Sequence, residues 1–171
     1  FRLDVADELP DDFIEKIRAA VKRVSPEKFL LGEVWEDATT KYGFGQRRTY
    51  LLGKGLDSVM NYPFKNAVLD FVKGKPAQQA MGEILSICEH YPAPAMDTAL
   101  NFLSTHDTER ALTVIADEPA NGRGREWQSG RCVTGEAYEE GMLRLRMAYA
   151  IIYTLPGVPC LHYGDEIGMQ G

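Results

Sequence analysis

The stretch Phe29-Leu30-Leu31-Gly32-Glu33-Val34 is a short apolar run that is interrupted near its end by the carboxylate of Glu33. A continuous apolar run of this length predicts a strand that is buried on both faces, as in a parallel sheet. Residues 9–24, just before it, carry apolar side chains near the helical period and include the acidic pair Asp11-Asp12 in the first turn. They predict an amphipathic helix. A helix that leads into a buried strand is a unit of parallel α/β folds.

The same alternation extends in both directions from this segment. Residues 1–5 form a strand-like stretch, residues 42–45 a glycine-rich loop, and the polar residues 118–135 an excursion loop. Further strands are predicted at 57–61, 101–105 and 156–163, and further helices at 64–72, 77–90 and 136–155. Strands that alternate with helices predict a parallel sheet with crossover connections, either doubly wound or a (β/α) barrel.

The composition excludes several classes of protein. The chain has 171 residues, of which 44% are hydrophobic and 26% charged, which is typical of a globular protein with a buried core. The net charge of −6 argues against nucleic acid as a partner. The longest apolar run, residues 148–155, is shorter than the roughly 20 residues of a membrane helix, so no membrane partner is expected.

The cysteines and the N-terminal residues bear on the compartment. Cys88, Cys132 and Cys160 are odd in number and widely spaced, which favours reduced thiols over a disulfide framework or a zinc site. The first residues contain no basic-plus-apolar leader, so a signal peptide is not visible. The thiols fit a reducing compartment, and a cytoplasmic protein is expected on that ground.

Polar side chains follow four of the predicted strands. Asp4, Glu33, Asn61 and the pair His106-Asp107 all stand where a strand ends. Because the carboxyl ends of parallel strands meet on one face, these groups are expected to lie together. Two carboxylates at one site are what glycoside hydrolysis requires, one as nucleophile and one as proton donor. Phosphoryl transfer is disfavoured because the glycine-rich residues 42–45 do not follow a strand as a phosphate loop would.

Each of these residues also has a purely structural interpretation. A carboxylate at a strand end is often a helix cap or a solvated loop charge, and Arg2 near Asp4 could form a structural ion pair. His106 could cap the following helix, and Trp35 could fill the core. No pair of histidines at i and i+4 indicates a metal site. The residues alone therefore predict an α/β enzyme with clustered carboxylates.

Four segments of the sequence resemble motifs of the α-amylase superfamily, glycoside hydrolase family thirteen. Phe1-Arg2-Leu3-Asp4-Val5-Ala6 resembles its fourth-strand motif, and Gly32-Glu33-Val34-Trp35 resembles its fifth-strand motif. Residues 102–107 resemble the seventh-strand motif, and residues 156–159 with 163–169 the eighth. The motifs occur in the family's order and span nearly the whole chain, so the resemblance is specific although each motif alone would be weak.

The resemblance is strongest to the branch of neopullulanases, cyclomaltodextrinases and maltogenic amylases. Residues 33–35, 59–64 and 169–171 carry this finer similarity. It implies a retaining hydrolase that cuts α-1,4 and sometimes α-1,6 glucosidic bonds of maltodextrins, cyclodextrins or pullulan. The expected partner is an α-glucan oligosaccharide, and no cofactor and no metal are implied.

The resemblance also assigns roles to residues. It implies Asp4 as nucleophile, Glu33 as general acid and base, and Asp107 as stabiliser of the transition state. Retaining chemistry predicts that the carboxyl groups of Asp4 and Glu33 lie about 5 to 5.5 Å apart. The residues expected to bind substrate or hold the site are Arg2, Trp35, His106, Asp7 and Glu8.

The length of the chain conflicts with the fold that the resemblance implies. A complete (β/α)8 TIM barrel takes about 250 residues, so residues 1–171 are expected to be its C-terminal half, strands four to eight, with no complete domain boundary inside. Such a fragment is expected to be inactive by itself. Its open sheet edges and apolar strand faces predict self-association.

Two alternatives to a glycoside hydrolase of this family remain open, and a third is disfavoured. An α-glucan transglycosylase shares all four motifs, and a non-catalytic carbohydrate-binding or scaffold relative would not need the nucleophile. An unrelated doubly wound hydrolase would be expected to carry a GxSxG nucleophile elbow, and the sequence contains none.

Overall fold

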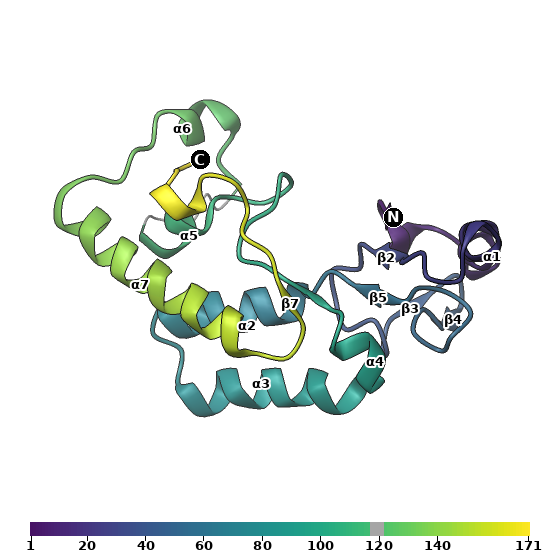
Figure 1. Ribbon diagram of the computed structural model, residues 1–171. Coiled ribbons are helices and arrows are strands. Elements are labelled where there is room, and N and C mark those ends of the chain that lie inside the picture. Colours follow the sequence, from purple (N-terminus) through teal and green to yellow (C-terminus); the bar gives the residue numbers. More distant parts are fainter. Residues whose placement is uncertain (117–121) are drawn as a thin grey trace.

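The computed structural model describes residues 1–116 and 122–171. Its central element is a series of short parallel strands (Figure 1). These strands are β1 (Arg2–Leu3), β2 (Leu31–Gly32), β5 (Ser58–Val59), β6 (Leu100–Asn101) and β7 (Val158–Pro159). Strand β1 pairs with β2, β2 with β5, and β6 with β7, all in parallel. A parallel bridge between Met60 and Leu100, in which Asn61 N donates to Leu100 O at 2.9 Å, connects β5 to β6.

The order of the strands in space is therefore their order in the chain. A doubly wound sheet reverses its strand order at a switch point, whereas the strands of a (β/α) barrel are added one after another. The described strands show no reversal. The parallel α/β prediction is confirmed, and of its two forms the arc of a barrel is the one observed.

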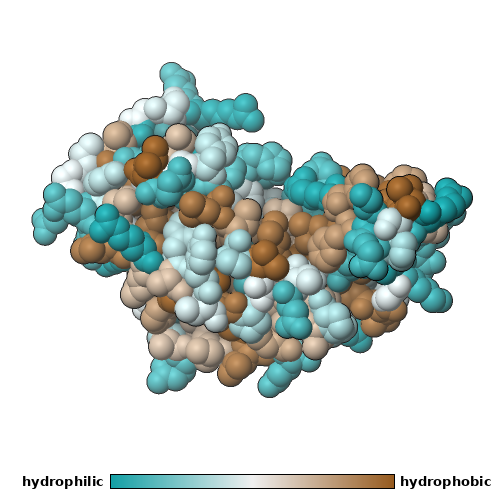
Figure 2. Space-filling view, viewed as in Figure 1, coloured by the Kyte–Doolittle hydropathy of each residue, from teal (hydrophilic) through white to brown (hydrophobic). Residues whose placement is uncertain are grey.

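The long helices lie close to their predicted positions. They are α1 (Asp11–Val24), α2 (Tyr62–Val72), α3 (Ala77–His90) and α7 (Gly135–Thr154). In Figure 1, α2, α3, α5 (Ala111–Ala116) and α7 lie together on one side of the strands, while α1 lies near the N-terminus. The side chains through which these helices meet, among them Phe64, Leu112 and Leu145, form the main core. The face shown in Figure 2 carries hydrophilic and hydrophobic side chains side by side. No described helix is both long and apolar enough to cross a membrane.

Several short elements differ from the sequence predictions. The helices α4 (Ala93–Met96), α5 and α6 (Arg125–Ser129), and the 3₁₀ turns η1 (Ala6–Glu8) and η2 (Asp165–Ile167), were not among the predicted segments. Helix α6 makes the prediction of one loop over 118–135 wrong for residues 125–129, and residues 117–121 of that segment lie outside the described residues. Helices this short span too few turns to show an apolar period.

The strands are also shorter than predicted, and the one predicted at 101–105 is wrong for residues 102–105. Polar groups of those residues form hydrogen bonds within the turn that follows β6. Ser104 Oγ accepts from Ala111 N at 2.8 Å, and Thr105 N donates to Thr108 Oγ1 at 3.0 Å. Because these groups serve the turn, the ladder with β7 ends at Asn101.

The glycine-rich segment 42–45 is a β-hairpin rather than a loop. Its strands are β3 (Tyr42–Gly43) and β4 (Gln46–Arg47), and the turn residues Phe44 and Gly45 both have positive φ, 53° and 77°. Two successive positive φ values define the turn whose twist matches that of paired strands, and glycine adopts such a conformation without steric cost. The sequence analysis predicted a glycine-rich loop here, and the two flanking strands were missed.

A buried arginine fixes this hairpin region to the start of α1. Arg48 donates from Nε to Asp11 Oδ1 at 2.8 Å, and from Nη1 to Asp7 O at 2.9 Å. Its Nη2 donates to Leu9 O, and its guanidinium lies 4.4 Å from the centre of the Tyr50 ring. All of its nitrogens are therefore used in structural contacts.

Asp57 links α1, β2 and β5 through one carboxylate. It accepts from Arg18 at 2.7 Å, and from Lys22 at 2.9 Å, and Leu30 N donates to it at 2.8 Å. Burial by itself would raise the pKa of Asp57, but the hydrogen bonds from Lys22, Leu30 and Arg18 outweigh it and lower that pKa below its ordinary value. The carboxylate therefore stabilises the fold in its ionised form.

This lowered pKa predicts a pH dependence of stability. In the unfolded chain Asp57 titrates near the ordinary value of about 3.9, so its contribution is fully present above that pH and is lost as the pH falls through the folded value. Asp57→Asn should lower the free energy of unfolding by about 1–3 kcal/mol at pH 7, because charge-assisted hydrogen bonds are lost. Urea unfolding at pH 7 and at stepwise lower pH measures this difference.

The control is Asp97→Asn, which replaces an exposed aspartate at the end of α4. It should change stability little at any pH. A difference between wild type and Asp57→Asn that stays constant from pH 7 down to pH 3 would contradict the electrostatic origin of the effect.

Candidate functional site

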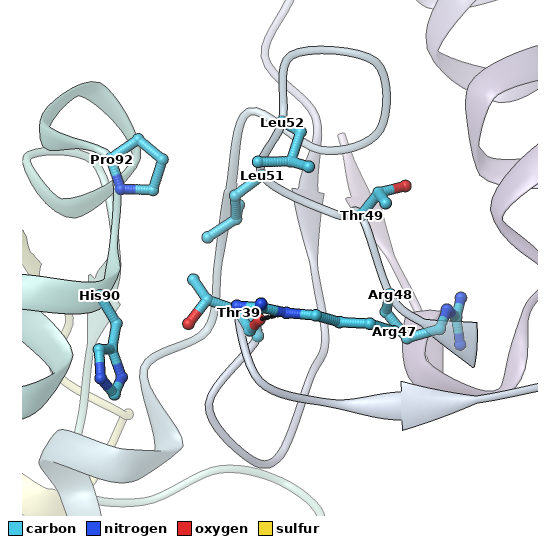
Figure 3. Close-up of a pocket in the computed structure, with 9 residues that line it drawn as sticks. Thr39, Arg47, Arg48, Thr49, Leu51, Leu52, His90 and Pro92 are labelled. Atoms are coloured by element: carbon cyan, nitrogen blue, oxygen red, sulfur yellow. Dashed lines mark hydrogen bonds between the residues drawn. The ribbon is translucent and has the colours of Figure 1, made fainter. Parts of the chain in front are cut away.

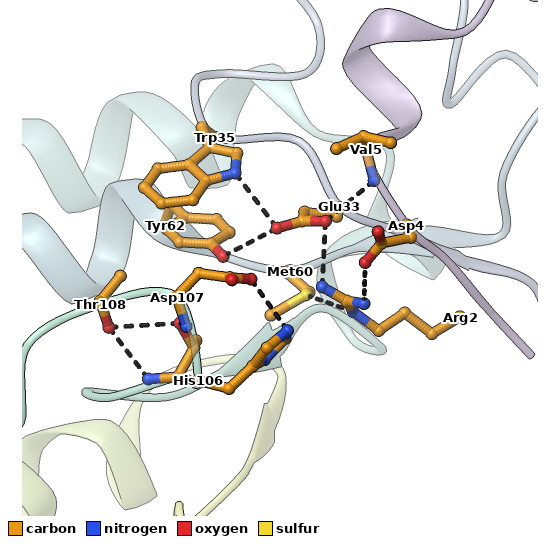
Figure 4. Close-up of polar contacts among 11 residues, drawn as sticks. Arg2, Asp4, Val5, Glu33, Trp35, Met60, Tyr62, His106, Asp107 and Thr108 are labelled. Atoms are coloured by element: carbon orange, nitrogen blue, oxygen red, sulfur yellow. Dashed lines mark hydrogen bonds and ion pairs between the residues drawn. The ribbon is translucent and has the colours of Figure 1, made fainter.

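The carboxylate of Glu33 lies at the end of β2, is only 2% exposed, and receives four donors (Figure 4). Oε2 accepts from Val5 N at 2.9 Å and from Arg2 Nη2 at 3.0 Å. Oε1 accepts from Trp35 Nε1 at 3.2 Å and from the Tyr62 hydroxyl at 3.4 Å. A buried carboxylate is costly unless its oxygens are paired, and here each oxygen has two partners.

Arg2 connects Glu33 to Asp4. Its Nη1 contacts Asp4 Oδ1 at 2.5 Å while its Nη2 contacts Glu33, and its Nε contacts Met60 Sδ at 3.3 Å. The Asp4 side chain is 68% exposed, in contrast to the buried Glu33. The structure thus brings together two of the three predicted catalytic residues, one accessible and one enclosed, across a single guanidinium.

Val5 has an unusual backbone conformation immediately after Asp4. Its φ and ψ are 43° and 42°, in the left-handed region that β-branched residues avoid. Such a conformation costs of the order of 1–3 kcal/mol and persists only where surrounding contacts enforce it. Here the Val5 amide hydrogen bonds to Glu33, so this turn supplies a donor to the buried carboxylate.

An aromatic stack covers the other side of Glu33. The Trp35 and Tyr62 rings are stacked with centroids 4.3 Å apart, and Phe102 meets Tyr62 edge-on at 4.9 Å. Burial and the neighbouring Glu33 carboxylate raise the pKa of Tyr62 to about 12, so Tyr62 keeps its proton and can donate. Trp35 is 41% exposed, which argues against its being simple core filling.

Tyr62 and Val5 belong to the site but were not singled out from the sequence. Tyr62 lies in the segment 59–64 that carried part of the family resemblance, and this was a usable signal. No sequence pattern indicates that Val5 adopts a left-handed conformation.

His106 and Asp107 follow β6 and contact each other at 3.0 Å. Both side chains are exposed, and Asp107 N donates to Thr105 Oγ1 at 3.2 Å. In Figure 4 they lie below Tyr62 and Met60, and the contacts drawn join them to each other and to their own turn rather than to Glu33. Their segment reaches the Glu33 cluster through the contact of Phe102 with Tyr62.

Asp7 and Glu8, on η1, lie outside the Glu33 cluster. The Asp7 carboxylate is largely buried and contacts Lys41 Nζ at 3.3 Å, while Glu8 is exposed. Lys41 also binds Glu36, so Asp7 takes part in a charge network between η1 and the loop after β2.

A separate hollow of about 270 Å³ lies between the segment that follows Trp35 and the end of α3 (Figure 3). It is lined in part by Thr39, Arg47, Arg48 and His90. Arg48 is committed to structural contacts, and Arg47 Nε donates to Thr39 O at 2.6 Å. His90 Nδ1 lies 2.6 Å from Asp37 Oδ2, outside the lining. The hollow therefore presents mainly apolar walls and polar groups already in use.

Metal ligands are not gathered anywhere in the described residues. No group of three or more histidine, cysteine, aspartate or glutamate side chains there could hold a metal ion. Cys88, Cys132 and Cys160 are free thiols. The groups arranged for chemistry are thus two carboxylates, an arginine, a tyrosine and a tryptophan.

An arc of a (β/α) barrel that carries paired carboxylates at its strand ends is the architecture of a class of barrel glycosidases. Residues 6–171 match the family model described as alpha amylase, catalytic domain. The chain belongs to the α-amylase catalytic-domain family, which confirms the resemblance inferred from its four motifs.

Individual relatives cover the whole chain. It is 34% identical over 187 residues to an amylopullulanase of Thermoanaerobacter thermohydrosulfuricus, and 34% identical over 174 residues to a cyclomaltodextrinase of Thermoanaerobacter pseudethanolicus. A solved structure of the cyclic alpha-maltosyl-(1→6)-maltose hydrolase from Arthrobacter globiformis, complexed with its cyclic sugar, matches 99% of the chain with a TM-score of 0.75 and 27% identity. The chain spans 11%, 25% and 32% of these three proteins, respectively.

The aromatic stack predicts how Tyr62 variants behave. Tyr62→Phe removes one long hydrogen bond but keeps the ring. The free energy of unfolding should therefore fall by about 1 kcal/mol, and Trp35 should stay in place. Tyr62→Leu removes the stacking surface as well and should free the Trp35 ring. In a Trp127→Phe background, which leaves Trp35 as the single tryptophan, fluorescence emission should move to longer wavelength in Tyr62→Leu but not in Tyr62→Phe.

Tyr153→Leu serves as the control, because Tyr153 is an exposed tyrosine of α7. Its emission should match that of the parent. Equal emission spectra for Tyr62→Leu and Tyr62→Phe would contradict the stacked arrangement.

Proposed function

We propose that the protein carrying this chain is a retaining glycoside hydrolase. Its substrates are α-1,4 and, in some cases, α-1,6 glucosidic bonds of maltodextrins, cyclodextrins or pullulan. The observation that carries the proposal is the pairing of exposed Asp4 with buried Glu33 across the Arg2 guanidinium. The names of relatives support it, since they include a cyclomaltodextrinase and an amylopullulanase.

The proposed reaction uses the two carboxylates in turn. Asp4, which is accessible, attacks the anomeric carbon and displaces the leaving oxygen, while the adjacent Arg2 holds the Asp4 carboxylate in place. Glu33 donates a proton to the leaving oxygen and then removes one from the water that displaces Asp4 from the anomeric carbon, as retaining glycosidases require. The four donors around Glu33 hold it in a fixed orientation, which is what proton transfer at a defined atom needs.

Of the remaining predicted residues, His106, Asp107 and Trp35 would contact the sugar. The exposed pair His106 and Asp107 can hydrogen bond to sugar hydroxyls, with Asp107 favouring the distorted ring of the transition state. Trp35 presents a half-exposed ring beside the proton donor, on the leaving-group side. Asp7 and Glu8 would line the same side, Asp7 through its network with Lys41.

A transglycosylase is the second candidate, and the exposed Trp35 ring is the feature that favours it. An aromatic surface beside the acid/base could hold an acceptor sugar in place of water. Product analysis with an added acceptor separates the two activities. A non-catalytic carbohydrate-binding relative is disfavoured by the presence of the Asp4 carboxylate, and a loss of activity in Asp4→Asn would exclude it.

The free thiols support the proposal of a reducing, cytoplasmic compartment. We also propose that copies of this chain associate through the open strand face. A hollow of about 450 Å³ there is lined by mainly apolar side chains that include Phe1, Phe29, Leu100 and Val158. Phe1 is 72% exposed, and β1 has one unpaired edge in the described structure. Exposed apolar surface beside an open strand edge favours association.

Sedimentation velocity tests this association. At micromolar concentration the chain should sediment as a dimer or larger species, and Phe29→Lys should shift it towards the monomer. Phe13→Lys is the matched control, because Phe13 is similarly exposed but lies on α1 away from the open face. A monomer of wild type at these concentrations would overturn the proposal.

The catalytic assignment predicts the effect of Glu33→Gln. In the gene product that carries this chain, removing the proton donor should lower kcat for maltodextrin hydrolysis by about 10²–10⁴-fold. Reducing-sugar release measures this, and Glu27→Gln, an exposed residue before β2, should retain activity. The 171-residue chain alone should release no appreciable reducing sugar, because misplacement by about 1 Å can already cost 10²-fold.

Activity of Glu33→Gln within threefold of wild type would refute the role of Glu33. Release by the chain alone at the rate of the gene product would refute the proposed inactivity and leave the assignment of Glu33 standing.

A further inference from the structure

A second groove begins at Trp35 and runs along α3. Its volume is about 720 Å³, and it lies between the loop after β2, the first turn of α2 and the outer face of α3. Trp35 and Ser86 lie among its lining residues, as do Asn66, Gln78 and Gln79. Binding sites for small ligands commonly have volumes of about 300–1,000 Å³, so the groove is large enough for part of an oligosaccharide.

The chemistry of the lining suits a neutral, hydroxyl-rich ligand. The side chains of Asn66, Gln78, Gln79 and Ser86 have no hydrogen-bond partner among the described residues. Amides both donate and accept, and so can pair with sugar hydroxyls in either sense. None of the described lining residues is basic, and the carboxylates present disfavour an anionic ligand.

The carboxylates of the groove are each paired with a side chain that does not line the groove. Glu36 binds Lys41, Asp37 contacts His90 at 2.6 Å, and Glu83 contacts Lys75 at 2.6 Å. The free polar groups are therefore the amides and the hydroxyl.

Gly82 lies near the middle of α3 and faces this groove. Glycine is among the least favourable residues in a helix interior. The described surroundings of this position do not require a glycine, because a Cβ built at Gly82 would have nothing within 4 Å among them. Its missing side chain keeps the groove open, in contrast to Gly141 of α7, where a Cβ would lie 2.6 Å from Ala116 Cβ.

The groove is continuous with the Glu33 cluster through one residue. Trp35 lines the groove and donates from Nε1 to Glu33 Oε1 at 3.2 Å. A sugar unit on Trp35 would thus lie beside the proposed proton donor, and the units beyond it would extend along α3. We propose that this groove binds the leaving-group end of an α-glucan chain, beyond Trp35. The proposal rests on the proposed function and adds to it a preference for longer substrates.

Calorimetric titration of the 171-residue chain with maltose and with maltohexaose tests the groove. Maltohexaose should bind about tenfold more tightly than maltose, because its additional units reach the amides of α3. The side-chain amide signals of Gln78 and Gln79 in ¹⁵N spectra should shift with maltohexaose and not with maltose. Gly82→Leu should fill the groove and abolish the advantage of the longer sugar.

Gly82→Ala is the matched control, since it improves helix propensity in the same way but adds only one methyl group. It should keep the preference for maltohexaose, and thermal unfolding should show both variants folded. Three results would each overturn the proposal that the groove binds the glucan: equal affinity for the two sugars, no binding of either, or an unchanged preference in Gly82→Leu.

Failure of the proposed function gives a different pattern. Length-dependent binding that Gly82→Leu abolishes, together with a Glu33→Gln gene product of wild-type activity, would leave the groove standing and remove the assignment of Glu33. Loss of activity in the Glu33→Gln gene product, together with equal binding of short and long sugars by the chain, would remove the groove and leave the assignment of Glu33 standing.

Discussion

The buried Glu33 carboxylate is the constraint on which the arrangement of the site depends. A carboxyl group that is almost inaccessible to water must have its oxygens satisfied by the protein. The four donors come from segments far apart in the sequence: Arg2 and Val5 from the end of β1, Trp35 from the loop after β2, and Tyr62 from the start of α2. Satisfying one carboxylate therefore fixes the relative positions of three strand ends.

A chain of buried amides fixes the next strands in the same way. Asn61 Nδ2 donates to Asn101 Oδ1 at 2.9 Å, and Asn101 Nδ2 donates to Pro156 O at 2.7 Å. The Asn61 side-chain oxygen also accepts from Phe64 N, so the same residue caps α2 and thereby positions Tyr62. Because a shift of one residue would leave these buried groups unpaired, the amides specify the register of β5, β6 and β7.

The elements that leave a periodic pattern in the sequence were the ones that could be predicted. Helices α1, α3 and α7 are long enough to show the 3.6-residue period, and their bounds lie within two residues of the predictions. The pairing of Asp4 with Glu33 followed from the convergence of parallel strand ends. The left-handed Val5 could not be predicted, because a single strained residue leaves no pattern and is enforced by tertiary contacts.

The hydrogen bonds and ion pairs that the fold already makes explain which acidic side chains remain free for chemistry. Asp57 is enclosed by Arg18, Lys22 and the Leu30 amide, and Asp165 is 2% exposed and bonded to Tyr149 and Arg110. The hydrogen-bonding capacity of these two carboxylates is therefore used within the fold. Asp4 has one charged partner and an exposed side chain, so its remaining lone pairs face solvent where a substrate would bind.

The same reasoning separates Asp7 from Asp107. Asp7 is largely buried against Lys41, and its backbone oxygen is used by Arg48, whereas the Asp107 carboxylate contacts only the exposed His106 within the described structure. A carboxylate that the fold does not need, held on a turn whose backbone is fixed by Thr105 and Thr108, costs little to retain and is free to meet a ligand. Unused bonding capacity at a fixed position, rather than residue type alone, is therefore what distinguishes Asp4 and Asp107 from Asp7, Asp57 and Asp165.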